Sequence, residues 1–99
     1  MAPYSIEELK TIITPIARQY GVKSVSIFGS YSRGMASIDS DIDLKIEKGA
    51  LHSLFQLSEF RLAIEDALKL PVDLVTSEAS DKRFLDMIAI DEVVLYRDA

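Results

Sequence analysis

The amino-acid sequence predicts a small domain of the α/β or α+β class. Stretches with apolar residues at helical spacing alternate along the chain with shorter stretches in which every second residue is apolar. With 99 residues, of which 48% are hydrophobic, the chain suffices for one domain, 1-99, near the lower size limit for independent folding. Alternation of this kind is typical of a β-sheet that packs against helices.

The first predicted element is a helix that begins after Ser5. Ser5 and Glu8 have the spacing of a capping box, in which each side chain binds the backbone N–H of the other residue. Apolar residues continue at helical spacing up to Gly21, a typical C-cap residue. Pro15 lies inside this pattern. The sequence therefore leaves open a kinked helix or a second short helix that begins at Thr14.

Two strands and an intervening turn are expected next. Residues 22–28 read as a strand, and the glycine- and serine-rich residues 29–36 predict a turn that runs into a short helix. The following strand, 41–47, alternates polar and apolar residues in the pattern of a half-buried strand. Its apolar members are expected to face the core: Ile42, Leu44 and Ile46.

The second half of the chain repeats the alternation. Residues 51–68 have helical composition, but their apolar side chains form two stripes on opposite sides. Either this helix breaks at 56–58, or its second stripe contacts a partner. The remaining predicted elements are a strand, a short helix and a last strand, at 72–76, 84–90 and 93–96.

Composition excludes several classes of protein. The chain has no cysteine and one histidine, His52, which excludes disulfides and zinc sites built from thiolates or several imidazoles. Its net charge of −5 argues against broad binding of nucleic acid. No window approaches the roughly 18 apolar residues that span a bilayer, and the N-terminal segment does not resemble a signal peptide. We therefore expect a cytoplasmic protein that binds neither membranes nor nucleic acid directly, with His52 facing solvent.

A dense group of carboxylates points to a metal site. Asp39, Asp41 and Asp43 lie within five positions. Asp41 and Asp43 are two apart on a predicted strand, so both side chains point to the same face, with Cα atoms about 6–7 Å apart. Two such charges about 4 Å apart repel by roughly 4 kcal/mol at an effective dielectric constant near 20. Paired hard oxygen ligands such as Asp41 and Asp43 suit Mg²⁺. Asp39 is instead expected to be a turn or capping residue.

The turn just before these aspartates predicts a phosphate site. Gly29 allows close approach of the backbone to a ligand, and Ser30 is expected at the start of a short helix, where free N–H groups favour an anion. A phosphate cradle beside a metal clamp indicates phosphoryl or nucleotidyl transfer.

Two other motifs fit these residues less well. The turn has the GxxxxG spacing of a P-loop, but Met35 and Ala36 stand where the motif needs lysine and a hydroxyl residue. The aspartate triplet resembles the start of an EF-hand loop, but Leu44 and Ala50 replace its glycine and its bidentate glutamate. Neither motif is therefore adopted.

The stretch GSYSRGMASIDSDIDLKIE, 29–47, closely resembles the signature of the nucleotidyltransferase (polymerase-beta-like) superfamily, GS-x-x-RG followed by a D-x-D strand. It is most similar to the stand-alone minimal nucleotidyltransferase (MNT) domains of bacteria and archaea, and the resemblance covers essentially the whole chain. It implies a nucleotidyltransferase fold, with a small mixed β-sheet flanked by helices, and a two-metal Mg²⁺ mechanism.

The resemblance also implies roles for individual residues. Asp41 and Asp43 would be the first two catalytic, metal-binding carboxylates, and Asp73 would supply the third from strand 72–76. Its position, independently of the resemblance, places Lys45 on the face of Asp41 and Asp43, where it could contact phosphate. Tyr31, beside the cradle, could stack on a base or simply pack.

In the implied nucleotide site, Gly29 and Ser30 hold the triphosphate of ATP. Arg33 orients the short helix or touches phosphate, or else forms a structural ion pair with Asp39 or Asp41. Ser32 stands where many relatives have alanine, and Ser37 lies where they have a further basic residue. This departure predicts a less basic phosphate site.

The family resemblance implies transfer of AMP from ATP to a partner protein. Small MNT proteins commonly pair with a HEPN-domain toxin and act as its antitoxin, so a HEPN protein is the expected partner, in a hetero-oligomer or other oligomer. Two alternatives stay open. One is a non-catalytic antitoxin that neutralises by binding, and the other is an adenylyltransferase that acts on a small molecule.

Overall fold

The computed structural model describes residues 3–98, which form a four-stranded sheet and three helices. The elements in chain order are α1 (Ile6–Tyr20), β1 (Ser24–Phe28), β2 (Ile42–Glu47), α2 (Leu54–Leu68), β3 (Val72–Thr76), α3 (Lys82–Ala89) and β4 (Val93–Arg97). The strand order is β3-β2-β1-β4. β1 runs antiparallel to β2 and β4, while β2 and β3 are parallel. The small mixed sheet flanked by helices is thus confirmed.

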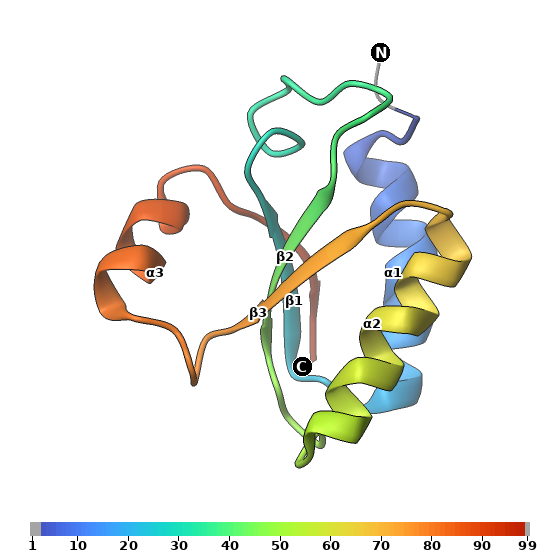
Figure 1. Ribbon diagram of the computed structural model, residues 1–99, viewed down its shortest axis with the longest axis vertical. Coiled ribbons are helices and arrows are strands. Elements are labelled where there is room, and N and C mark those ends of the chain that lie inside the picture. The colour runs from blue at the N-terminus through green and yellow to red at the C-terminus, as the bar shows by residue number, and fades with distance from the viewer. Residues whose placement is uncertain (1–2, 99) are drawn as a thin grey trace.

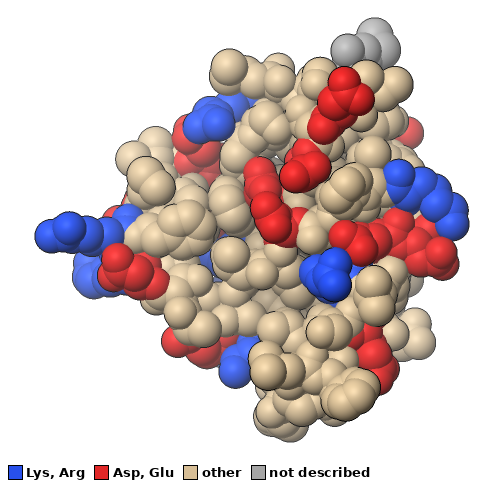
Figure 2. All heavy atoms as spheres, in the orientation of Figure 1, with Lys and Arg blue, Asp and Glu red and all other residues tan. Residues whose placement is uncertain are grey.

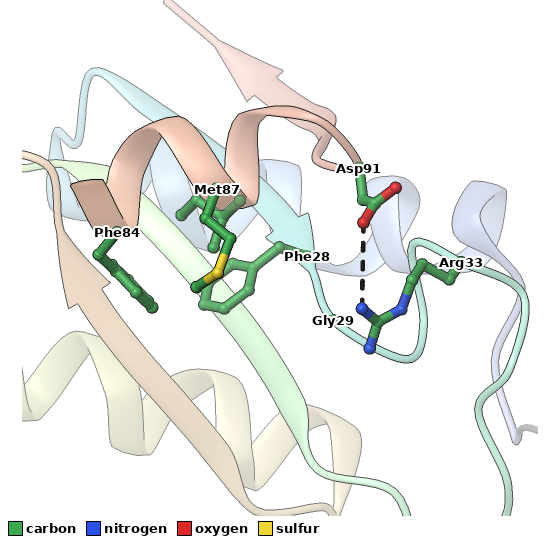
Figure 3. Close-up of a pocket in the computed structure, with 7 residues that line it drawn as sticks. Phe28, Gly29, Arg33, Phe84, Met87 and Asp91 are labelled. Atoms are coloured by element: carbon green, nitrogen blue, oxygen red, sulfur yellow. Dashed lines mark ion pairs between the residues drawn. The ribbon is translucent and has the colours of Figure 1, made fainter. Parts of the chain in front are cut away.

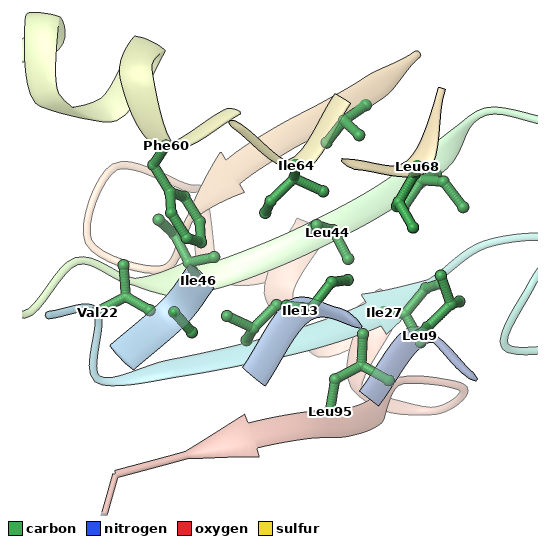
Figure 4. Packing of buried hydrophobic residues seen from close by; sticks show 14 of the residues in the cluster. Leu9, Ile13, Val22, Ile27, Leu44, Ile46, Phe60, Ile64, Leu68 and Leu95 are labelled. Carbon is green, nitrogen blue, oxygen red and sulfur yellow. The ribbon is translucent and has the colours of Figure 1, made fainter. Parts of the chain in front are cut away.

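The helices cover the two faces of the sheet unequally. α1 and α2 lie together on one face, and α3 stands alone on the other side (Figure 1). The core fills the space between the α1/α2 layer and the sheet (Figure 4). Its fully buried members include Leu9, Ile13, Ile27, Leu44, Ile46, Phe60 and Ile64. The face that carries α3 is consequently the one with room for a ligand.

Helix α1 has the predicted start and end. Ser5 and Glu8 form both hydrogen bonds of the capping box, and Gly21 takes a left-handed conformation at φ 72°. The helix is continuous through Pro15, so a second helix from Thr14 is not formed. Pro15 is exposed, which lets water serve the carbonyl that the proline leaves without a helical N–H partner.

Helix α2 also runs without a break, from an N-cap at Ser53, whose Oγ accepts a hydrogen bond from the N–H of Gln56 at 3.1 Å. Of the two alternatives for this segment, the break at 56–58 is therefore wrong. One side of α2 packs in the core. The other side, which we call the outer α2 face, carries Leu54, Phe55 and Leu62, with exposed fractions of 82%, 81% and 53%.

The short helix predicted within 29–36 is replaced by a turn. The N–H of Arg33 donates to the carbonyl of Gly29 at 3.2 Å, and that of Met35 to the carbonyl of Ser30 at 2.8 Å. Gly34 then takes a φ of 70°, which ends the turn before a helix can propagate. An argument from a helix dipole therefore does not apply to the predicted phosphate site. Within residues 3–98, none of the helices is long and apolar enough to cross a membrane.

Candidate active site

Two of the predicted carboxylates meet across the parallel strand pair. The register of β2 and β3 places Asp43 opposite Asp73. Ile42 and Leu44, on either side of Asp43, are fully buried toward α1 and α2. The side chain of Asp43 therefore points to the face that carries α3. Asp41 lies just before β2, is exposed, and shares this face by its two-residue spacing.

The carboxylates influence one another electrostatically. Burial raises the pKa of Asp43, and the negative charges of Asp73 and Asp41 raise it further, while Arg33 lowers it. Figure 2 shows acidic side chains in a row across the upper half of the molecule, over the end of the sheet where β2 begins. Among the described residues, no three acidic or histidine side chains are already close enough together to hold a metal ion. The structure therefore brings the predicted residues into one region without closing them into a complete ligand shell.

Gly29 joins the turn to the carboxylates. It has a φ of 75°, and a Cβ added there would collide with Oδ2 of Asp43 and lie 3.3 Å from its Cγ. Ser32 supports this geometry, because its Oγ donates to the carbonyl of Gly29 at 2.9 Å. Ser32 thus stabilises the turn. Ser30, half-buried, follows Gly29 directly.

Arg33 and Lys45 are both held by the turn between α3 and β4. Arg33 pairs with Asp91 at 3.9 Å, and the two side chains are 51% and 41% exposed. Lys45 pairs with Glu92 at 2.8 Å, and these side chains are only 18% and 19% exposed. The ion pair of Arg33 is therefore made with Asp91 rather than with Asp39 or Asp41. Neither Asp91 nor Glu92 was identified from the sequence.

Three other sequence predictions have clear outcomes. Tyr31 is 5% exposed and belongs to the core cluster, so it packs rather than stacks on a ligand. Its hydroxyl has no hydrogen-bond partner among residues 3–98, and burial, with a contribution from Tyr4, raises its pKa. His52 and Asp39 are exposed, as expected for a solvent-facing residue and a turn residue.

A pocket of about 240 Å³ lies between the end of β1 and α3 (Figure 3). Its apolar walls are Phe28, Phe84, Met87 and Ile88, and it also touches Gly29, Arg33 and Asp91. Figure 3 shows the Arg33–Asp91 ion pair beside the three apolar side chains that it labels. This pocket was not predictable from the sequence, because its two halves lie more than fifty residues apart in the chain.

Comparisons with known proteins agree on one protein family. Residues 10–99 match the family described as "Polymerase beta, Nucleotidyltransferase". The chain is 35% identical over 98 residues to the protein adenylyltransferase MntA of Thermococcus cleftensis, with 95% of this chain and 98% of that protein covered.

Solved structures share the fold. A chain of a toxin-antitoxin complex with AMP-PNP superposes with a TM-score of 0.78 at 22% identity, covering 90% of this chain and 73% of that one. A chain from a complex of a tri-AMPylated HEPN toxin of Shewanella oneidensis with an MNT antitoxin gives a TM-score of 0.72 at 19% identity, covering 94% and 73%.

Proposed function

Because the chain belongs to the polymerase beta nucleotidyltransferase family, we propose that it transfers AMP from ATP to a partner protein with the help of Mg²⁺. The observation that carries this proposal is the convergence on one sheet face of Asp43 with Asp73, and of Gly29 with Asp43. In such a transfer an acceptor hydroxyl releases its proton to solvent and its oxygen attacks the α-phosphorus. The bond from that phosphorus to the oxygen bridging to the β-phosphorus breaks, and pyrophosphate leaves.

The donor set suits Mg²⁺. Asp41, Asp43 and Asp73 offer only carboxylate oxygens, the hard ligands that this ion prefers. Mg²⁺ usually takes one or two protein carboxylates and completes its shell with water and substrate phosphates, so an open arrangement of carboxylates is compatible with it. Bound there, Mg²⁺ would neutralise phosphate charge and align the reacting groups. The core holds the Asp43 carboxylate in position. Ile42 and Leu44 are buried there, which fixes β2 and the direction in which Asp43 points.

The triphosphate would lie along the Gly29 turn. Gly29 has no side chain to obstruct close approach, and Ser30 follows with a hydroxyl and a backbone N–H. Arg33 is half-exposed, and its ion pair with Asp91 is long at 3.9 Å. Surface pairs of this kind contribute little, about 0–1 kcal/mol. Arg33 can therefore turn from Asp91 toward a phosphate oxygen.

A HEPN-domain protein is the acceptor that we propose, with this chain as its antitoxin. Support comes from a 35% identical protein adenylyltransferase and from fold neighbours in toxin-antitoxin complexes, one of them with an AMPylated HEPN toxin. The outer α2 face supplies apolar surface for such a contact, since Leu54 and Phe55 are both more than 80% exposed. Exposed apolar patches of this kind often mark interaction sites.

The test is to mix the purified protein with its HEPN partner, ATP and Mg²⁺, and to weigh the partner by mass spectrometry. We expect a gain of one or more AMP units, and no gain with the Asp41→Asn/Asp43→Asn variant. Asp39→Asn is the matched control, because Asp39 is an exposed aspartate in the same segment that the site does not use.

Other results would select the alternatives. A tight complex without mass change would overturn transfer and favour neutralisation by binding alone. Transfer that persists in the Asp41→Asn/Asp43→Asn variant would remove both aspartates from the mechanism. ATP consumption with a small-molecule acceptor, and none with the HEPN protein, would redirect the activity to that acceptor.

A further inference from the structure

We propose that the pocket between β1 and α3, which we call the base seat, binds the nucleobase of the nucleotide substrate, and that it favours adenine. This inference rests on the proposed nucleotidyl transfer and goes beyond it, because it assigns base recognition to residues that no signature of the chain includes. Its position, its apolar walls and its one acidic group each support it.

The position of the pocket fits a nucleotide whose phosphates lie on the turn. Gly29 and Arg33 belong both to the pocket wall and to the proposed phosphate cradle. The same Gly29 lies against the carboxylate of Asp43. A ligand in the pocket would therefore lie directly beside the reacting phosphates, on the sheet face that carries α3. One molecule can occupy cradle and pocket together.

The size and walls of the pocket suit a flat ring. Its volume is about 240 Å³, below the range of roughly 300–1,000 Å³ for pockets that enclose a whole drug-sized ligand. Phe28 and Phe84 meet edge to face, with ring centroids 5.9 Å apart and an interplanar angle of 85°. Met87 is 61% exposed at the pocket, so its thioether is available to a ligand. Thioethers and aromatic rings make favourable contacts with other aromatic rings.

Asp91 sets the preference among bases. Its Oδ2 is 3.9 Å from a guanidinium nitrogen of Arg33, which leaves acceptor capacity on the carboxylate. A carboxylate accepts hydrogen bonds, so it favours a base that presents an exocyclic amino group. Guanine and cytosine also carry an amino group, but adenine is the common base that has one without any carbonyl oxygen to bury, which suits a pocket with four apolar walls and one acceptor.

The experiment compares ATP with inorganic tripolyphosphate, which has the phosphate chain without the base. Both are titrated calorimetrically into the protein with Mg²⁺. Met87→Ala should weaken ATP binding about three- to tenfold and leave tripolyphosphate binding unchanged. Ile90→Ala is the matched control: Ile90 follows the same helix, is 82% exposed and does not line the pocket. It should alter neither ligand.

Asp91→Asn tests the polar end of the pocket. ATP should bind more tightly than purine riboside triphosphate, which lacks only the amino group, and the substitution should shrink that ratio severalfold. The ratio cancels any effect of releasing Arg33, because both ligands carry the same phosphates.

Three outcomes would overturn the base seat while leaving the proposed transfer in place. Equal binding of ATP and tripolyphosphate by the parent protein would show that no base is held. Equal loss of both ligands in Met87→Ala would show that the pocket serves phosphate. An ATP affinity unaffected by Met87→Ala, with a weaker complex with the acceptor protein, would assign the pocket to the acceptor. Failure of the parent protein to bind either ligand with Mg²⁺ would instead overturn the proposed nucleotidyl transfer, and the base seat with it.

Discussion

At the scale of single residues, two glycines in one turn face different neighbours. Gly29 and Gly34 have nearly equal φ angles of 75° and 70°. A Cβ on Gly29 would collide with Asp43, whereas one on Gly34 would meet nothing within 4 Å. Substitutions at the two glycines therefore distinguish the effect of backbone strain from the effect of contact with the Asp43 carboxylate.

We predict that Gly34→Ala destabilises the protein by about 1–2 kcal/mol, the cost of a left-handed backbone for an L-residue. Gly29→Ala should cost more and should abolish ATP binding, because the new methyl group displaces Asp43. Urea unfolding and calorimetric titration of both variants provide the measurement. Equal losses of stability and retained ATP binding in both variants would contradict the close approach of Gly29 to Asp43.

The raised pKa of Asp43 predicts a pH-dependent stability. A carboxyl whose folded pKa lies above its ordinary value, 3.8, stabilises the fold below that value and loses this contribution as the pH rises through the raised pKa. In the presence of EDTA, Asp43→Asn should therefore raise Tm by about 2–4 °C at pH 7. The difference should disappear toward pH 3.5. A Tm for Asp43→Asn at or below the parent value at pH 7, or a gain that Asp39→Asn matches, would count against this repulsion.

The aspartates were predictable from sequence, but their partners were not. Spacing along one strand places Asp41 and Asp43 on one face. The pairing of Arg33 with Asp91, by contrast, depends on where α3 sits above the sheet. No local pattern encodes a contact between residues so far apart. Their role as a catalytic site remains a prediction, which the proposed transfer experiment tests.

At the scale of elements, local signals predicted most of the helices and strands. Capping residues and the period of apolar residues placed α1 and β2 within a residue or two. The signals failed where two readings were locally equivalent. Residues 29–36 could begin a helix, but Gly34 ends the turn. The start of α2 was predicted too early, because Leu51 is buried in the core from a position before the Ser53 cap.

The Ser53 cap yields an element-scale prediction. Ser53→Ala should destabilise the protein by about 1 kcal/mol, since it removes the acceptor for the N–H of Gln56. Ser58→Ala, an exposed change inside the same helix, should be neutral or stabilising by a few tenths of a kcal/mol, because alanine has the higher helix propensity. Urea unfolding of both variants checks this. A loss in Ser58→Ala as large as that in Ser53→Ala would remove the special role of the cap.

At the scale of the whole molecule, one sheet face holds the core and the other holds the candidate site. The strand order β3-β2-β1-β4 was not predictable from local patterns, because it depends on which edges the helices leave free. Helix α2 packs on the sheet face that holds the core (Figure 1). The outer α2 face points away from that core and carries the most exposed leucine and phenylalanine of the described residues.

We predict that Phe55→Ser/Leu62→Ser leaves the Tm of the isolated protein within about 2 °C, since both side chains are more than half exposed. The same variant should weaken the complex with the proposed HEPN partner at least tenfold in a calorimetric titration. Ile90→Ser, which removes an equally exposed apolar side chain at the end of α3, is the control. An unchanged affinity for the partner would exclude the outer α2 face from that interface.

The pairing of Asp43 with Asp73 also has a kinetic side. The two residues belong to strands joined through the whole of α2, and they become neighbours only when β3 docks in register. An ion shared by both carboxylates would bind only chains in which this crossover is closed. If those contacts form late, such an ion slows unfolding and leaves the folding rate nearly unchanged. The carboxylate pair would then stabilise the closed crossover to a degree that depends on the concentration of free divalent cation. The lifetime of the folded chain, and not only its chemistry, would therefore respond to that ion.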